Sequence, residues 1–314
     1  MCKIILDCDP GHDDMMAMII AFASKELEVL AVTTSAGNQT QDKTNYNARK
    51  IMTFMGVEGI PVARGCEKPI VRNLRVADDI HGETGLDGAD LGRPGFESVP
   101  QHAVELMRDI LVNSTEKVAI VATGPLTNVG VLLTTYPQLK EKIKCISFMG
   151  GSAYGGNVTP RAEFNIFVDP EAAHIVFNSG LPLIMSGLEV THEAQIKHAD
   201  IARIRSIGNR LGTVTADLLD FFIQTTTPPV FASSDHEEGA HMHDPCAVAV
   251  LISPEKFIMG NFFGDIELTG QYSTGNTVID LHGVSKKTPN VKVAFDLDNE
   301  WMVDLILQSV AEFR

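Results

Sequence analysis

Cysteines are few in this sequence, and it contains no long apolar run. The 314 residues include five cysteines, an odd number scattered between Cys2 and Cys246, without any C-x-x-C pair. This usage argues against a disulfide framework and favours a reducing compartment. No apolar stretch approaches the roughly 20 residues that span a bilayer, and the residues after Met1 show no signal-peptide pattern. We therefore expect a cytoplasmic protein that does not enter a membrane.

Positive charge is scarce as well. The chain has 25 Lys and Arg residues against 40 Asp and Glu residues, which gives a formal net charge of −15. A surface of this sign repels phosphates, so a nucleic-acid polymer is not an expected partner. The negative charge does not exclude small uncharged substrates, and some of the excess acidic residues are available as metal ligands. An apolar content of 44% indicates a chain with a sizeable core.

Apolar runs alternate with helical patterns along most of the chain. The expected strands cover residues 3–8, 27–36, 117–122, 144–149 and 181–186. The expected helices cover residues 13–24, 40–55, 169–178, 200–224 and 298–313, with another starting near 125. This alternation predicts an α/β fold, a single domain over residues 1–314 with a mainly parallel, doubly wound central sheet. Residues 262–281 look β-rich, and the Gly-rich stretch 64–100 is typical of a functional or mobile loop.

The sharpest feature is the segment D-C-D-P-G-H-D-D from Asp7 to Asp14, with four carboxylates in eight residues. Asp7 and Asp9 are two apart at a strand end and point to the same side. Asp13 and Asp14 begin a helix, where the macrodipole favours negative charge. Helix capping explains two of the four acids. The others need a positive partner, and a hard divalent cation such as Ca²⁺ or Mg²⁺ suits oxygen ligands.

Polar residues recur where other strands end, as expected for ligand contacts of a parallel sheet. Asn38 follows the second strand, Thr123 follows the strand at 117, and Met149 closes the next one. Further polar candidates are Asn157, Glu163 and Asn165. Taken singly, Asn38 is better explained as a turn residue after Gly37, whereas Thr123 is equally typical of an ordinary strand-to-helix turn.

A second candidate element is His241-Met242-His243-Asp244-Pro245, which precedes an apolar helix. Asp244 before Pro245 is a typical helix N-cap, but the two neighbouring histidines favour a site. Such a set is able to bind Zn²⁺. The lack of a second His/Cys cluster and the Asp-rich partners favour a harder ion.

Taken together, these segments resemble the inosine–uridine nucleoside hydrolase family from Ile4 to about Val303. The most specific piece is the Asp7 to Asp14 segment, which fits D-x-D-P-G-x-D-D at every fixed position. The resemblance implies hydrolysis of the N-glycosidic bond of free purine or pyrimidine ribonucleosides, with a bound Ca²⁺ that activates water. It further implies a role in nucleoside catabolism and salvage, and assembly into homodimers or homotetramers.

The resemblance also implies roles for individual residues. Asp9 is similar to the general base that takes a proton from water, and His243 is similar to the histidine that assists the departing base. His81 looks like a base-side residue of a mobile loop. The implied Ca²⁺ ligands are Asp9, Asp14, the Thr123 carbonyl and Asp244. The implied substrate contacts besides His81 are Asp13, Asn38, Met149, Asn157, Glu163 and Asn165.

Three residues either differ from the family pattern or have no role in it. His12 stands where an apolar or small residue is more usual, and neither it nor His241 receives a role. The purine-specific branch places tryptophans around the base, whereas the single tryptophan here, Trp301, belongs to the expected terminal helix. The His-x-His-Asp element looks more like the branch that uses both purines and pyrimidines. The preferred base stays open.

Two other functions compete with this interpretation. Phosphohydrolases of the haloacid-dehalogenase type also carry D-x-D after a strand, but they have Thr or Val where this chain has Gly11, and they lack the second acidic pair. A non-catalytic nucleoside-binding protein would keep Asn38, Glu163 and Asn165 without needing a metal. The carboxylate surplus argues against it.

Overall fold

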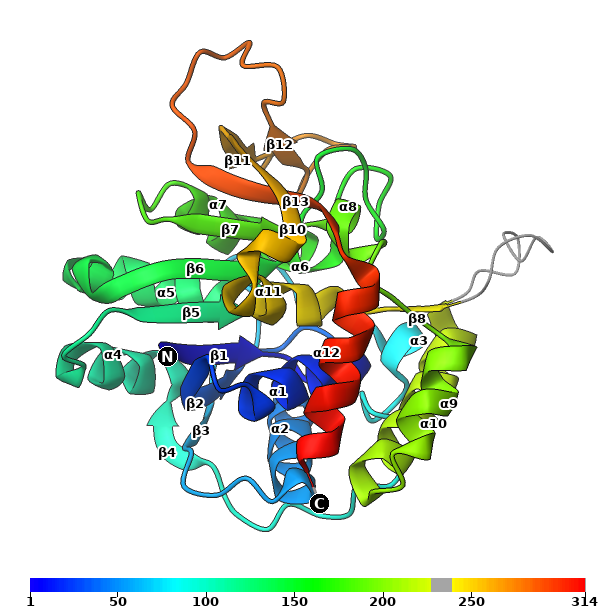
Figure 1. The fold of residues 1–314 in the computed structure, drawn as a ribbon. Helices are drawn as coiled ribbons and strands as arrows, with labels where there is room; N and C mark the ends of the chain where they lie inside the picture. Colours follow the sequence, from blue (N-terminus) through cyan, green and yellow to red (C-terminus); the bar gives the residue numbers. More distant parts are fainter. Residues whose placement is uncertain (227–238, 314) are drawn as a thin grey trace.

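A nine-stranded sheet forms the centre of the molecule (Figure 1). A computed structural model describes residues 1–226 and 239–313 of the chain. The strand order is β10-β13-β7-β6-β5-β1-β2-β3-β4. The strands are β1 (Cys2–Cys8), β2 (Leu27–Thr34), β3 (Val62–Arg64), β4 (Val99–His102), β5 (Val118–Ala122), β6 (Ile143–Met149), β7 (Leu183–Ser186), β10 (Phe257–Phe262) and β13 (Val291–Leu297). Only the β10–β13 pairing is antiparallel among the pairings of this sheet, so the mainly parallel α/β fold is confirmed.

The strand β1 lies in the middle of the sheet because its apolar run suits burial on both faces. Ile4 pairs with Val29 on β2 and with Ala119 on β5, both in parallel register. From β1 the chain builds β2, β3 and β4 on one side and then crosses to β5 on the other. The boundary between β1 and β5 is therefore a topological switch point, where open α/β sheets bind ligands beyond the strand ends.

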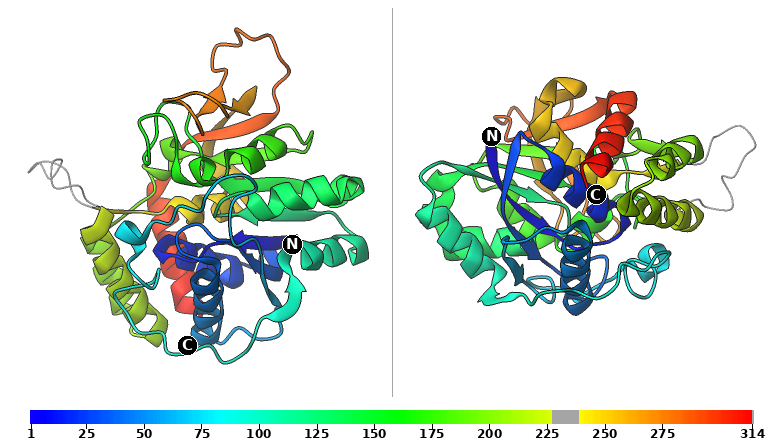
Figure 2. Two further views of the ribbon diagram at one scale, coloured as in Figure 1. Left: turned by 180° about the vertical axis from the view of Figure 1, so that it is seen from behind. Right: turned by 60° about the horizontal axis from the view of Figure 1, so that its bottom comes forward.

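Helices cover both faces of the sheet (Figures 1 and 2). One hydrophobic cluster contains residues of α1 (His12–Ala23), α2 (Gln41–Met55), α11 (His243–Ile252) and α12 (Asn299–Glu312). A second cluster contains residues of α4 (Ala103–Asn113), α5 (Thr127–Thr135) and α7 (Pro170–Phe177). No helix among residues 1–226 and 239–313 has the length and apolar character needed to cross a membrane.

Shorter elements lie at the ends and edges of the sheet. They are the helices α3 (Asp78–His81), α6 (Phe164–Val168) and α8 (Leu188–Thr191), the 3₁₀ turns Pro137–Lys142 and Pro254–Lys256, and the strand pairs β8 (Gln195–Lys197) with β9 (Gly239–His241) and β11 (Gly264–Ile266) with β12 (Thr277–Ile279). The stretch 64–100 is mostly irregular, as expected, apart from α3 and short strand ends.

One expected helix is two helices, and several elements were not expected, among them α4 and β13. The stretch 200–224 divides into α9 (His198–Ser206) and α10 (Arg210–Thr226), because Gly208 adopts a left-handed backbone with φ +76°. The two helices lie side by side (Figure 1). The helix α4 and the strand β13 lack a clear pattern in the sequence.

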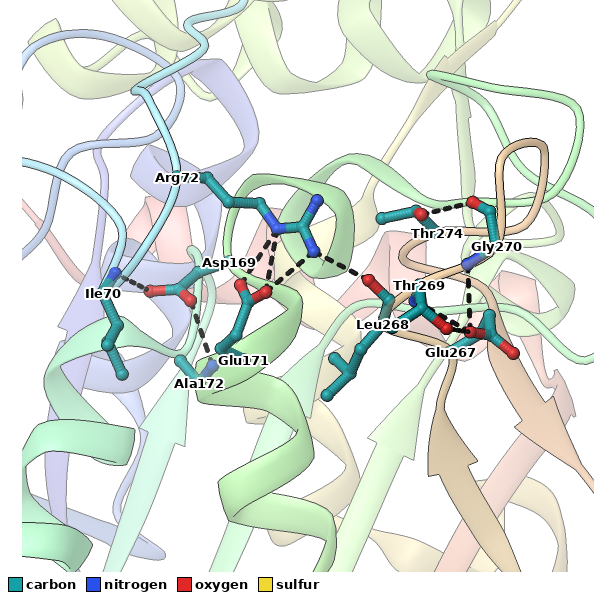
Figure 3. Close-up of polar contacts among 10 residues, drawn as sticks. All are labelled: Ile70, Arg72, Asp169, Glu171, Ala172, Glu267, Leu268, Thr269, Gly270 and Thr274. Carbon is teal, nitrogen blue, oxygen red and sulfur yellow. Dashed lines mark hydrogen bonds and ion pairs between the residues drawn. The ribbon is translucent and has the colours of Figure 1, made fainter.

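The loop that leads to α3 is fastened to α7 and to the segment after β11 (Figure 3). The Arg72 guanidinium donates to both carboxylate oxygens of Glu171, at 2.7 and 2.9 Å, and to the Leu268 carbonyl at 3.0 Å. The Ile70 amide donates to Asp169 Oδ2 at 2.9 Å. Two segments that are far apart in sequence, the start of α7 and the segment after β11, thereby hold the root of this loop.

Candidate active site

The end of β1 places Asp9 in a narrow space between two glycines. A Cβ on Gly37 would lie 2.1 Å from Asp9 Oδ2, and one on Gly124 would lie 2.3 Å from Oδ1. The Asn38 amide donates to Oδ2 at 2.7 Å, whereas the buried Oδ1 has no hydrogen-bond partner among the described residues. One oxygen of this carboxylate is therefore anchored, and the other is left for a proton or a cation.

Asp14, in the first turn of α1, is held by four donors. Its Oδ1 accepts from the Thr123 hydroxyl at 2.7 Å and from the Asp9 amide at 3.3 Å. Its Oδ2 accepts from the Gly11 amide at 2.9 Å and from the Asn38 side chain at 3.0 Å. The carboxylate is fixed by groups from β1, from α1 and from the ends of β2 and β5.

Three buried carboxylates form a group suited to a metal ion. Asp13, Asp14 and Asp244 each offer an oxygen, and these oxygens lie within 4.8 Å of one another. Burial, followed by the charge of Asp14, raises the pKa of Asp13 to about 7. Burial and neighbouring acids also raise the pKa of Asp9 and of Asp244 well above the usual range. A hard divalent cation fits this donor set, because it would offset the repulsion that the buried carboxylates otherwise suffer.

A cavity of about 500 Å³ opens beside these carboxylates. It is lined by ten of the residues expected from the sequence: Asp13, Asn38, His81, Thr123, Met149, Asn157, Glu163, Asn165, His243 and Asp244. Asp9 and Asp14 do not line it; they lie behind it, in hydrogen-bond contact with Asn38 and, for Asp14, with Thr123. The structure thus gathers the whole expected set at the carboxyl ends of β1, β2, β5 and β6 and at the start of α11.

The side of the cavity near α6 presents an ordered amide and carboxylate set. Glu163 caps α6 and accepts from the Gly151, Asn165 and Ile166 amides at 2.9, 2.9 and 3.1 Å. Burial nevertheless raises the pKa of Glu163 to about 7. The Asn165 side chain donates to the Thr123 carbonyl at 2.7 Å. The Asn157 side-chain oxygen accepts from the backbone of the residue after Glu163 at 2.9 Å, which leaves its amide group for a ligand.

The cavity is also lined by four histidines, His81, His192, His241 and His243, which are called the histidine wall below. The rings of the last three lie 5.0 to 5.8 Å apart. The Thr191 hydroxyl lies 2.7 Å from His243 Nδ1. Burial lowers the pKa of His241 to about 4 and those of His81 and His243 well below the usual range. These rings are therefore neutral hydrogen-bonding groups around neutral pH.

Several lining residues did not emerge from the sequence. Besides His241, which had no role, they include His192, Phe222, Arg75 and Ile80. Each lies on a segment whose local pattern indicates only a loop or a helix. The guanidinium of Arg75 lies over the Phe167 ring, 5.5 Å from its centroid.

Two acids near the site serve the fold. Asp7, the first acid of the cluster, accepts from the Thr33 hydroxyl at 2.7 Å and from Asn128 at 2.8 Å, so it joins β1 to β2 and α5 away from the cavity. Asp169 is the N-cap of α7, as expected, and accepts from the Ala172 amide at 3.0 Å.

Comparison with solved structures defines the class of this fold and site. A purine-preferring ribonucleoside hydrolase from Gardnerella vaginalis superposes with a TM-score of 0.90 at 28% identity and covers 98% of both chains. An inosine-guanosine nucleoside hydrolase superposes with a TM-score of 0.91 at 26% identity over the full length of both chains. The fold is that of enzymes that hydrolyse nucleosides.

Sequence comparison gives the family. The profile of the inosine-uridine preferring nucleoside hydrolases matches residues 4–304. A pyrimidine-specific ribonucleoside hydrolase, RihA, from Photobacterium profundum is 51% identical over 310 residues, 99% of each chain. The corresponding protein of Enterobacter is 50% identical over 310 residues, 99% of this chain and 98% of the relative. The chain belongs to the inosine-uridine preferring nucleoside hydrolase family, and it is a ribonucleoside hydrolase, as the resemblance implied.

Proposed function

We propose that this enzyme hydrolyses the N-glycosidic bond of pyrimidine ribonucleosides and releases ribose and the free base. The observation that carries the proposal is a single cavity lined both by carboxylates and amides and by neutral imidazoles. The carboxylates and amides suit a ribose with its hydroxyl groups, and the imidazoles suit a planar base. The pyrimidine specificity in the names of relatives about 50% identical to this chain supports the choice of base.

A divalent cation, proposed to be Ca²⁺, would be held by Asp9, Asp14, Asp244 and the Thr123 carbonyl. Asp13 shares the same close carboxylate group. The Thr123 carbonyl has a second lone pair beside the one that accepts from Asn165. When bound, the ion would lower the pKa of water and order the ribose diol.

Asp9 is proposed as the general base. Its Oδ2 is anchored by the Asn38 amide at 2.7 Å, and its buried Oδ1 is available to take a proton from water. As the bond to the base lengthens, positive charge develops on the sugar. We propose that Asp13, Glu163, the Asn157 amide and the side chain of Asn165 bind the sugar hydroxyls and stabilise that charge.

His243 is proposed to supply a proton to the departing base. It adjoins the carboxylate Asp244 and faces the cavity from the other wall. Its neutral resting state means that the proton must be acquired before or during the step. The need for a proton donor is greatest for natural bases, which are poor leaving groups.

The test is turnover with measured metal content. Purified protein should release ribose from uridine and cytidine with a kcat/KM well above that for inosine. Elemental analysis should find about one divalent ion per chain, and calorimetry should show a lower Tm after chelation that Ca²⁺ restores. Equal use of inosine would reject the pyrimidine assignment. Full activity and an unchanged Tm in ion-free protein would reject the metal site.

A further inference from the structure

We propose that Asn47 is a positioning residue that holds His81 at a fixed place beside the carboxylates of the proposed metal site. Its side-chain amide joins two segments that are distant in sequence, the acidic segment from Asp7 to Asp14 and the turn that follows His81. The inference rests on the proposed function, because it concerns where the enzyme places a residue that is expected to contact the base.

Both hydrogens of the Asn47 amide have a partner. Asn47 lies on α2 and is 1% exposed. Its Nδ2 donates to the Pro10 carbonyl at 3.1 Å and to the Thr84 carbonyl at 2.9 Å. Carbonyl oxygens only accept, so the atom that lies between these two partners must be the nitrogen of the amide. The direction of both hydrogen bonds is therefore fixed by the chemistry of the partners.

One of the two bonds reaches the turn of the acidic segment. Pro10 follows Asp9, and the next amide, that of Gly11, donates to Asp14 Oδ2 at 2.9 Å. His81 packs against this same turn, since a Cβ on Gly11 would lie 2.5 Å from His81 Nδ1. Gly11 permits a close approach that a side chain would prevent. The place of His81 beside the acidic segment therefore depends on how the two backbones are held together.

The other bond reaches a compact turn after His81. The Asp87 carboxylate accepts from the amides of Glu83 and Thr84, at 2.9 and 3.2 Å. The Asp87 amide donates to the His81 carbonyl at 3.4 Å. Residues 82–87 are thereby bonded to one another and to the histidine, so a bond to the Thr84 carbonyl also restrains His81.

Two further side chains bond the carbonyls of this turn. Gln39, which precedes α2, donates to the Gly82 and Glu83 carbonyls, both at 3.2 Å. Lys43 donates to the Glu83 carbonyl as well. Lys43 and Asn47 are four residues apart and share one face of α2. Asn47 differs from the other two side chains because its second bond goes to the acidic segment, so it connects that segment, α2 and the turn.

His12 adds a second contact between the acidic segment and the turn. Its Nε2 lies 2.7 Å from the Asp87 carbonyl, and its ring stacks on that of His81 at 5.4 Å. The contacts of His12 and of Asn47 act at different points of the turn, Asp87 and Thr84, so loss of one leaves the other in place. We therefore expect removal of the Asn47 amide to weaken the positioning of His81 and not to abolish it.

Hydrogen exchange tests the role of Asn47 without any turnover. In Asn47→Ala, the backbone amides of residues 82–87 should exchange about tenfold faster than in wild type, as the loss of one hydrogen bond would allow. The metal content should stay at the wild-type value, because the donors to Asp9 and Asp14 come from other residues. If Asn47→Ala does not fold, Asn47→Ser, which keeps one donor, should show a smaller increase in the same direction.

Asn45→Ala is the matched control for exchange. Asn45 is also buried on α2, but its side chain bonds to Thr34 and Ser98. Its loss should leave the exchange of residues 82–87 unchanged. Unchanged exchange in Asn47→Ala, or equally fast exchange in Asn45→Ala, would overturn the proposal. Loss of the bound metal in Asn47→Ala would overturn it as well, because the role of Asn47 would then lie in the acidic segment.

A double-mutant cycle separates positioning from a merely structural role. Asn47→Ala should lower uridine kcat/KM about tenfold, mainly through a higher KM, as the loss of one hydrogen bond would. In a His81→Ala background the same substitution should have little further effect, because Asn47 acts through His81. Additive losses, or a His81→Ala variant as active as wild type, would overturn the positioning role. Absence of uridine turnover in the wild type would reject the proposed function but leave the exchange result standing.

Discussion

The two walls of the cavity respond to burial in opposite ways. Burial raises the pKa of Asp13 and Asp244 in the carboxylate wall and of Asp9 behind it, and it lowers the pKa of His81 and His243 in the histidine wall. Both effects favour the neutral form. A neutral imidazole is stable in the interior without further help, whereas neighbouring carboxylates that must be ionised need a cation. From this comparison we expect the carboxylate wall to depend on a metal ion and the histidine wall to depend on packing.

The walls also differ in how they are held. The carboxylates receive amide, hydroxyl and side-chain donors at fixed positions, such as the four donors to Asp14. The rings of the histidine wall contact one another at His192, His241 and His243, and His81 stacks on Phe222. We therefore expect a change in the carboxylate wall to affect every substrate, and a change in the histidine wall to affect substrates according to their leaving group.

The largest expected effect is that of Asp9→Asn. The amide cannot take a proton, so kcat should fall about 10²–10⁴-fold, and the fall should be the same for uridine and p-nitrophenyl riboside. Ribose binding, measured by calorimetry, should be partly retained. Asp7→Asn is the matched control, because Asp7 lies outside the cavity, and its kcat should stay near that of wild type. A mutant at Asp9 within a few-fold of the wild-type kcat would remove the general-base role.

His243→Ala should affect uridine and p-nitrophenyl riboside unequally. Uridine hydrolysis should fall by about 10²-fold or more, as for loss of a general acid, while p-nitrophenyl riboside should change little. The pKa of His243 is lowered by burial, so its protonated form becomes more populated as the pH falls. The wild-type ratio of uridine to nitrophenyl rates should therefore rise from pH 8 to pH 6, and the ratio for the mutant should stay flat. Parallel losses together with weaker Ca²⁺ binding would instead mean that His243 only positions Asp244.

A third prediction concerns the stability of the fold. Asp7 is suited to test it because this side chain lies away from the cavity. Burial raises the pKa of Asp7 to about 7, above its value of 3.8 in an unfolded chain. The folded state then binds the extra proton, so ionising Asp7 costs stability as the pH rises between these two values. The free energy of unfolding of the wild type should fall relative to Asp7→Asn from pH 5 to pH 8, by denaturant titration. A difference that does not change with pH would contradict the raised pKa.

The smallest effect should come from the ion pair between Arg72 and Glu171, which holds the root of the loop that carries His81. Arg72 and Glu171 are partly exposed, at 32% and 22% of their side chains. Such a pair contributes about 0–1 kcal/mol. Glu171→Gln should lower the free energy of unfolding within that range and leave uridine kcat/KM within about twofold. A tenfold loss of activity would show that the histidine wall is held from the root of this loop as well as from Asn47.

The carboxylate wall could be predicted from the sequence, and the histidine wall only in part. Asp9 to Asp14 lie within one segment, so a strand end, a turn and a helix start place them together. His12 lies in that same segment, yet its partners come from residues 81 to 87 and from α10, which no local pattern connects to it. His192 reaches the cavity only because α8 packs beside α11.

The elements of the fold differ in the same way: some could be predicted from their local sequence, and others depend on residues far away in the chain. The strands β1, β2, β5, β6 and β7 could be predicted because each is a short apolar run followed by a turn. The helix pair α9 and α10 looked like one helix, since the break at Gly208 depends on its backbone conformation. The strand β13 has alternating exposure and joins the sheet between β7 and β10, which come from distant parts of the chain.

The central position of β1 has a consequence for how the enzyme folds during and after its synthesis. Its partners on either side are β2, which follows closely in the chain, and β5, more than a hundred residues later; the acid at position 244 arrives later still. Contacts between distant residues form slowly, because the chain must first close long loops. A growing polypeptide on the ribosome therefore carries its acidic segment from the outset and gains a complete site only when its last third has been made. Recovery of activity during refolding should accordingly track the slowest kinetic phase.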